Sequence, residues 1–114
     1  MNVTRFDAAP EYAPPPDHSG MHCLRLQGHA AGPATMLWLG CSVIQPGGAI
    51  TLGGSPMEKH YVVLEGSVVF STAAEEATLG RWDSVRLAPG EARAVENRSD
   101  APATILLAMP LPPA

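Results

Sequence analysis

The sequence predicts an all-β domain of the jelly-roll or barrel type, and three observations support this. The 114 residues include 11 glycines and 12 prolines, which favour many turns between short strands. Lysine, a good helix former, occurs once, and no segment shows a convincing amphipathic helical pattern. Roughly seven to nine short β-rich segments follow one another with turn signals between them and no internal repeat, which is the spacing of a jelly roll or barrel.

The N-terminal third is expected to hold an arm and two strands. Residues 1–20 form the arm, because Pro10 and the proline run at 14–16 exclude a helix and favour extended geometry. MHCLRLQG (21–28) is predicted as the first strand and TMLWLGCSVI (35–44) as a buried one, with a Gly- and Pro-containing loop between them. Trp38 on the buried strand either lines a binding cavity or fills the core, and the sequence leaves both open.

The central stretch, residues 46–70, carries the most information about a site. Pro46 and the two glycines after it predict a turn, and YVVLEGSVVF predicts two strands joined tightly at Glu65 and Gly66. If residues 53–63 are extended, alternate side chains share one face. We expect that face to look into a pocket; it carries Gly53, Ser55, Met57, Lys59, Tyr61 and Val63.

The C-terminal part continues the same pattern of short strands and turns. A turn is predicted around 73–76, a strand through Val85 and Leu87, and a turn at 88–90. Another strand follows in EARAVEN, then a turn at 97–100 and a final apolar strand in ATILLAM (103–109).

Composition and charge exclude several classes of function. The net charge of −4 and only seven Lys and Arg residues argue against nucleic-acid binding. No apolar run reaches the length of a membrane span, and the first twenty residues lack the pattern of a signal peptide. Cys23 and Cys41, without a secretion signal, are expected to be reduced thiols, so a cytoplasmic location is predicted.

Two segments resemble the conserved motifs of the cupins, which are double-stranded β-helix (jelly-roll) proteins of the RmlC-like type. The first cupin motif has Gly, five residues, His-x-His, three or four residues, Glu or Gln, six residues, Gly; residues 46–70 fit this frame with Gly47 and Gly66. The second has Gly, five residues, Pro-x-Gly, two residues, His, three residues, Asn; residues 82–97 fit it with Gly90 and Asn97. The resemblance implies one cupin domain over 1–114, and cupin barrels commonly pair as homodimers. Phe6 and Tyr12 of the arm are suited to crossing to a partner.

The residues that hold a divalent metal in a typical cupin are replaced here. The histidine positions of the first motif hold Gly53 and Ser55, its Glu or Gln position holds Lys59, and the histidine position of the second motif holds Arg93. Glycine has no ligand atom, and ammonium and guanidinium groups repel a cation. We therefore predict no metal and no other cofactor. A site built instead from Glu58, His60 and a histidine of the arm is a weaker alternative, because these residues share neither spacing nor face.

Two cations facing an apolar barrel require counter-charges. These are either internal, Arg93 with Glu91 or Glu96 and Lys59 with Glu58, or they arrive with an anionic ligand. The second reading makes the protein a metal-independent cupin that binds a small carboxylate-bearing metabolite. Its predicted catalytic residues are Lys59 and Tyr61, and its predicted ligand-binding residues are Trp38, Ser55, Met57 and Arg93. The reaction would then be that of a lyase, isomerase or decarboxylase. The competing hypothesis is a non-catalytic ligand-binding or accessory cupin that has lost the metal site.

Overall fold

A computed structural model describes residues 1–112 of the chain. It is all-β, as predicted, with two one-turn 3₁₀ helices, η1 (Phe6–Ala8) and η2 (His29–Ala31). The nine strands are β1 (Glu11–Tyr12), β2 (His18–Gln27), β3 (Leu37–Gly53), β4 (Lys59–Glu65), β5 (Val68–Ser71), β6 (Glu76–Leu79), β7 (Ser84–Leu87), β8 (Arg93–Glu96) and β9 (Ala103–Pro110).

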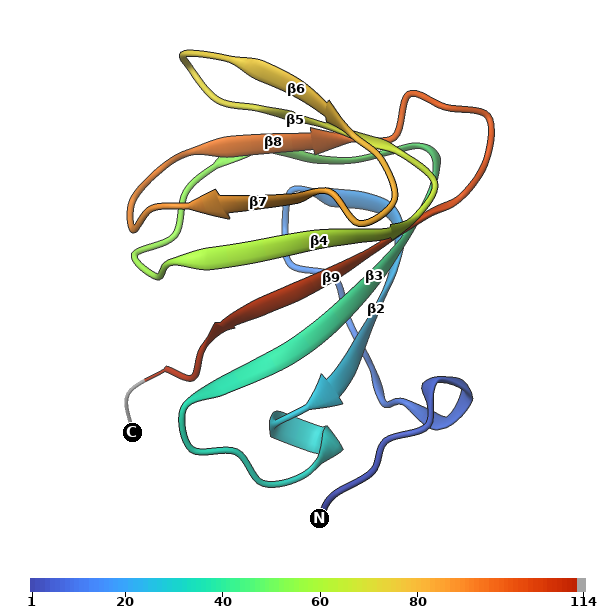
Figure 1. The fold of residues 1–114 in the computed structure, drawn as a ribbon, viewed down its shortest axis with the longest axis vertical. Helices are drawn as coiled ribbons and strands as arrows, with labels where there is room; N and C mark the ends of the chain where they lie inside the picture. The colour runs from blue at the N-terminus through green and yellow to red at the C-terminus, as the bar shows by residue number, and fades with distance from the viewer. Residues whose placement is uncertain (113–114) are drawn as a thin grey trace.

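The strands form a nearly closed barrel of two layers (Figure 1). Their hydrogen-bonded order is β6-β5-β8-β3-β9-β4-β7, and β2 adds to β3 and carries β1. The first half of β3 pairs with β9 in one layer, and its second half pairs with β8 in the other, so this strand belongs to both. The two ends of the order, β6 and β7, are consecutive in the chain and are joined by a turn at residues 80–83. This is the jelly roll predicted from the spacing of the strands.

The turn predicted at Pro46 is a corner within one strand rather than the end of a strand. Residues 45–48 have no partners in β2, because Met21 pairs with Ile44 and Ser19 with Ala49. The extra residues let β3 bend from one layer to the other. A side chain at Gly48 would lie 2.5 Å from the carbonyl oxygen of Gly20, so the two strands meet there only because Gly48 has none.

The motif residues that the chain retains have backbone roles. Gly47, Gly66 and Gly90 all have positive φ, between 75° and 81°. Asn97 is fully buried: its backbone bonds to Gly47 and Gly48, and its side-chain amide donates to the carbonyl oxygens of Ile44 and Ala101. Asn97 of the second motif therefore stabilises, by hydrogen bonds, the corner of β3 that the first motif forms. This explains why the fold persists although the ligand positions are replaced.

Two local predictions are wrong. Residues 54–58 form a loop between β3 and β4, so the expected extended run over 53–63 holds only from Lys59 onward. The two strands around Glu65 and Gly66 do not pair with each other; β4 pairs with β7 and β9, whereas β5 pairs with β6 and β8. The turn at Gly66 carries the chain from one layer to the other.

The core fills the space between the two layers. Its most deeply buried members come from both layers and include Ile44, Val63, Val68, Val95 and Ile105. The N-terminal arm joins this body through β1, which pairs with β2. No helix among residues 1–112 is long and apolar enough to span a membrane.

Candidate ligand-binding cavity

A cavity of about 380 Å³ opens into the barrel, a size suited to a small metabolite. Its walls come from β1 to β4, from β8 and β9, and from the proline-rich segment before β2. The charged, aromatic and polar residues that line it are Tyr12, Asp17, His18, Arg25, Trp38, Ser42, Thr51, Lys59, Tyr61 and Arg93. Four of the six side chains predicted from the sequence, Trp38, Lys59, Tyr61 and Arg93, are therefore brought together.

Arg93 is a buried guanidinium without a counter-charge. It lies on β8 opposite Gly53, and only 5% of its surface is exposed. Its Nη1 donates to the carbonyl oxygen of Gly53 at 3.1 Å and its Nη2 to the hydroxyl of Tyr61 at 3.3 Å. Its Nε is buried without a hydrogen-bond partner, and Arg93 forms no salt bridge with any residue from 1 to 112. Such a group lacks the compensation that a buried charge ordinarily requires.

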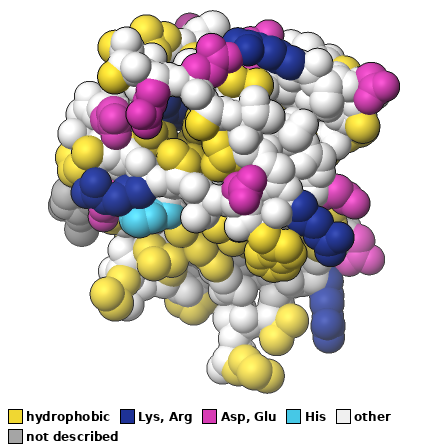
Figure 2. Space-filling model, turned by 45° about the horizontal axis from the view of Figure 1, so that its top comes forward, with side chains coloured by type: hydrophobic (Ala, Val, Ile, Leu, Met, Phe, Trp, Pro, Cys, Tyr) yellow, Lys and Arg dark blue, Asp and Glu magenta, His cyan; other side chains and the backbone are white. Residues whose placement is uncertain are grey.

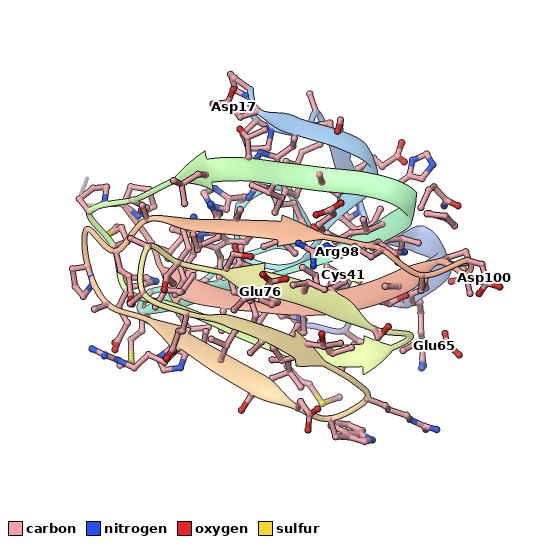
Figure 3. All side chains as sticks on the ribbon, turned by 90° about the horizontal axis from the view of Figure 1, so that it is seen from above. Asp17, Cys41, Glu65, Glu76, Arg98 and Asp100 are labelled. Atoms are coloured by element: carbon pink, nitrogen blue, oxygen red, sulfur yellow. The ribbon has the colours of Figure 1, made fainter. Side chains whose placement is uncertain are left out.

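The internal ion pairs considered for Arg93 are not formed. The carboxylate of Glu96 pairs with Arg98, which also pairs with Glu76, and Figure 3 shows Glu76 and Arg98 close together. The carboxylate of Glu91 accepts the backbone N–H of Ala88 at the turn before β8. Glu91 and Glu96 are thus engaged elsewhere, and neither supplies a counter-charge to Arg93.

Lys59 and Tyr61 reach the cavity from alternate positions of β4. Tyr61 is 3% exposed and packs against Phe70 with ring centroids 5.2 Å apart. Lys59 is half-buried, and burial, together with the charge of Arg93, lowers the pKa of its amine. The acid considered as its partner, Glu58, instead pairs with Arg86 and lies 3.7 Å from the imidazole of His60.

Ser55 and Met57, predicted as ligand-binding residues, lie in the loop before β4 and are not among the residues that line the cavity. The hydroxyl of Ser55 accepts the backbone N–H of Met57 at 3.1 Å, and the carbonyl oxygen of Ser55 accepts the N–H of Gly90. In this structure the serine therefore shapes the loop.

Two cavity residues, Arg25 and Tyr12, escaped the sequence analysis of the site because their positions depend on strand register. Arg25 of β2 stacks on two rings: its guanidinium carbon lies 3.7 Å from the ring centroid of Tyr12 and 4.5 Å from that of Trp38. Tyr12 and Trp38 meet edge to face at 6.1 Å. Tyr12 was expected to lie over a sheet or over a partner subunit, and in this structure it lies on the chain's own sheet through the pairing of β1 with β2. Trp38, 7% exposed, both fills space and lines the cavity.

Asp17 and His18 lie beside the cavity at the beginning of β2. Asp17 is exposed at the edge of the molecule, as Figure 3 shows, and has a left-handed backbone conformation with φ of 70°. His18 is half-buried with its Nδ1 3.1 Å from the carbonyl oxygen of Pro16. Burial lowers the pKa of His18, and the charges of Arg93 and Lys59 lower it further. The sequence offered both as isolated polar residues of the arm, with no signal for a site.

The cavity presents positive charge and does not fit a divalent metal. Of the four cupin ligand positions, Lys59 supplies an ammonium and Arg93 a guanidinium. Gly53 has no side-chain atom to offer, and the hydroxyl of Ser55 bonds within the loop. Within residues 1–112 no three His, Cys, Asp or Glu side chains come together as metal ligands. The weaker alternative also fails in its geometry, because Glu58 pairs with Arg86, and the arm histidine His18 lines the cavity whereas Glu58 and His60 do not. The donor set favours an anion over a cation.

Comparison with known proteins agrees with the fold. No family model matches the chain. A beta-D-galactosidase of Mycobacterium tuberculosis is 40% identical over 112 residues, which are 98% of this chain and 96% of that protein. The polyketide cyclase RemF from Streptomyces resistomycificus is similar in structure with a TM-score of 0.86 at 17% identity, over 96% of this chain and 79% of that one. A predicted oxalate decarboxylase from Thermotoga maritima gives a TM-score of 0.80 at 18% identity, over 98% of this chain and 100% of that one.

An RmlC-like cupin from Shewanella frigidimarina also has this fold, with a TM-score of 0.79 at 11% identity over 96% of this chain and 90% of that one. Fold and motifs together define a small cupin with enzyme-like structural neighbours. The chain belongs to the cupins and, within them, to the family of the mycobacterial protein.

Proposed function

We propose that this cupin binds a small carboxylate-bearing metabolite in its barrel, without a metal, and that Arg93 anchors the carboxylate. The observation that carries the proposal is the buried guanidinium that has an unpartnered Nε and no counter-charge. A carboxylate in the cavity would neutralise it and accept the fork of N–H groups that arginine presents.

The same geometry suits proton transfer next to the bound carboxylate. Burial and the charge of Arg93 lower the pKa of Lys59 and so favour its neutral form, in which the amine can take a proton from the carbon beside the carboxylate. The C–H bond breaks, an N–H bond forms, and the electron pair passes into an enolate whose charge Arg93 stabilises. The hydroxyl of Tyr61 accepts from Arg93, so its own proton is free for a departing group. Return of the proton at another atom gives an isomerase, and loss of a neighbouring group gives a lyase.

Binding and chemistry need separate tests. Isothermal titration with galactonate should show binding that Arg93→Met weakens by at least about 30-fold, because a carboxylate would lose its buried partner. Arg86→Met is the matched control, since Arg86 is an exposed arginine paired with Glu58. Equal affinity in both variants would contradict the anchor. Deuterium exchange at the ligand carbon, lost in Lys59→Met, would establish chemistry; binding without exchange would favour the accessory-protein hypothesis.

A second candidate, hydrolysis of a galactoside, is favoured by the name of the 40% identical relative. Most glycosidases use two carboxylates on either side of the scissile bond. Of the residues that line the cavity, Asp17 alone is a carboxylate, and it is exposed. Release of nitrophenol from a nitrophenyl galactoside, abolished by Asp17→Asn, would support hydrolysis and displace the acid-binding proposal.

The proposal includes a homodimer in the cytoplasm. Half-buried apolar side chains cover the outer face of the layer that contains the first half of β3, where an isolated sheet would be polar. They lie on β2, β3, β9 and β4 and include Leu24, Leu26, Leu39, Val43, Leu106 and Val62. A second copy packed on this face would cover them. Cys23 and Cys41 are free thiols on opposite faces of the sheet, which suits a reducing compartment.

A further inference from the structure

A second cation, Arg25, faces the cavity with its donors unused. Its guanidinium lies over the rings of Tyr12 and Trp38, which are nearly perpendicular to each other at 84° and whose centroids lie 3.7 and 4.5 Å from its central carbon. Among residues 1–112 its side chain makes neither a hydrogen bond nor a salt bridge, and none of its nitrogens is buried without a partner. A cation–π contact supplies no hydrogen-bond acceptor, so the N–H groups of Arg25 are left without a partner beside the cavity.

Strand register places Arg25 across the cavity from Arg93. Arg25 pairs with Gly40, Gly40 with Leu107, and Leu107 with Tyr61, which receives the hydrogen bond from Arg93. These four residues form one row on the inner face, and three strand spacings span about 14 Å. Between them, the ring of Trp38 lies over Gly40, which has no side chain, and Leu107 lines the cavity. The two arginines thus approach the space from opposite sides of the row.

The charges that line the cavity do not balance. Three cations, Arg25, Lys59 and Arg93, are accompanied by the exposed carboxylate of Asp17. Burial raises the pKa of Tyr12 to about 12, so this phenol stays neutral beside Arg25. The protein as a whole carries a net charge of −4, and acidic and basic side chains are interspersed over the face shown in Figure 2. The excess of positive charge is therefore a property of the cavity, and one carboxylate does not neutralise it.

We infer that the cavity has a second anion subsite at Arg25, and that the ligand is a dianion. One anionic group binds Arg93 and Lys59, the other binds Arg25, and the uncharged middle lies over Trp38. This inference rests on the proposed function, since it adds a second anchor to the same site. The second anionic group is a carboxylate, as in a sugar diacid, or a phosphate, as in a phosphorylated sugar acid.

Galactonate, galactarate and phosphogluconate test the subsite, since galactarate differs from galactonate by one terminal carboxylate. In isothermal titration the wild-type protein should bind at least one of the two dianions about 10-fold or more tightly than galactonate. Arg25→Met should remove that preference and change the affinity for galactonate less than about threefold. Arg25→Lys, which keeps the charge and loses the stacked fork, should retain part of it. The stronger of the two dianions identifies the second group as a carboxylate or a phosphate.

Each failure has its own meaning. If galactonate and both dianions bind wild type equally, or if Arg25→Met keeps the preference, the second subsite is refuted while the anchor at Arg93 stands. If none of the three binds the wild-type protein, the proposed function falls as well. The wild-type affinity ratio needs no variant, so the inference stays testable even if loss of the stack on Tyr12 unfolds the Arg25→Met protein.

Discussion

The stability of the Arg93→Met variant distinguishes between two roles of Arg93, the binding of a ligand and the support of the fold. The change removes two hydrogen bonds of a charged donor, to Gly53 and Tyr61, each worth about 1.5–3 kcal/mol. It also removes an uncompensated buried cation, whose effective desolvation penalty is several kcal/mol. These contributions oppose each other and are of similar size. We therefore expect the free energy of unfolding without ligand to change by no more than about 1 kcal/mol, which is about 4 °C in Tm for a chain of this length.

The assay is thermal unfolding of both proteins with and without a sugar acid. At a ligand concentration of 100 times Kd, wild type should gain about 2.7 kcal/mol, which is about 10 °C in Tm. With an affinity at least about 30-fold weaker, Arg93→Met should gain no more than about 0.9 kcal/mol at the same concentration, which is about 3.5 °C in Tm. The unliganded variant should match wild type, since the hydrogen bonds lost and the desolvation penalty removed offset each other.

A different result would refute this reasoning. Breaking a buried charge network typically costs 3–5 kcal/mol. If unliganded Arg93→Met loses that much stability, Arg93 is compensated within the protein, and its apparent lack of a counter-charge has no functional meaning. A ligand-induced shift that survives the substitution would likewise place the carboxylate elsewhere in the barrel.

Four further predictions concern the same barrel. The folded protein should bind the proton of Lys59 less tightly than the unfolded chain, so the free energy of unfolding should rise with pH between the lowered pKa and 10.5. Lys59→Met should lose that rise, and an ordinary pKa for the sole lysine, measured by NMR, would contradict the prediction. Gly40→Ala places a Cβ 2.5 Å from the ring of Trp38 and should cost about 1–3 kcal/mol, and an unchanged urea midpoint would show that the ring moves freely. Leu106→Glu should give a monomer by light scattering if the outer face is the dimer interface, and wild type should then be a dimer. Protein purified without a nickel column should contain far less than one equivalent of Zn, Mn, Fe, Ni or Cu by elemental analysis, and one equivalent held by barrel side chains would overturn the metal-free proposal.

The strand pattern and the motif frames could be predicted from sequence because both are local. Alternation along β4 correctly paired Lys59 with Tyr61, and the frame of the second motif placed Arg93 at the barrel wall. The alternation did not extend back to Ser55. Counting along an extended strand assumes that no loop intervenes, and residues 54–58 form one. The corner at Pro46 was not predicted because a Pro-Gly-Gly turn signal does not specify whether the chain reverses its direction or only bends.

The unpredicted half of the site depends on pairings between segments distant in sequence. Arg25 and Trp38 meet because β2 and β3 pair with a particular register, and Tyr12 joins them only because β1 adds to the edge of β2. Nothing within ten residues of Arg25 indicates two ring faces around it. A one-residue slip of β2 would turn Arg25 outward and Leu24 inward, so its place in the cavity follows from the whole sheet.

The replaced motif positions preserve the sign of the charge that a ligand meets. A metal in a cupin offers a cationic centre to oxygen atoms, and here Lys59 and Arg93 offer cationic groups from two of the same four positions. Coordination and redox chemistry depend on open positions of a metal ion, whereas a guanidinium offers fixed hydrogen bonds and charge. Such groups still suit the proposed recognition of an anion, and the chemistry that they could perform is electrostatic stabilisation and proton transfer. The backbone of the barrel depends on other motif residues, Gly47, Gly66, Gly90 and Asn97, which do not line the cavity. The fold is therefore compatible with the replaced residues at the ligand positions.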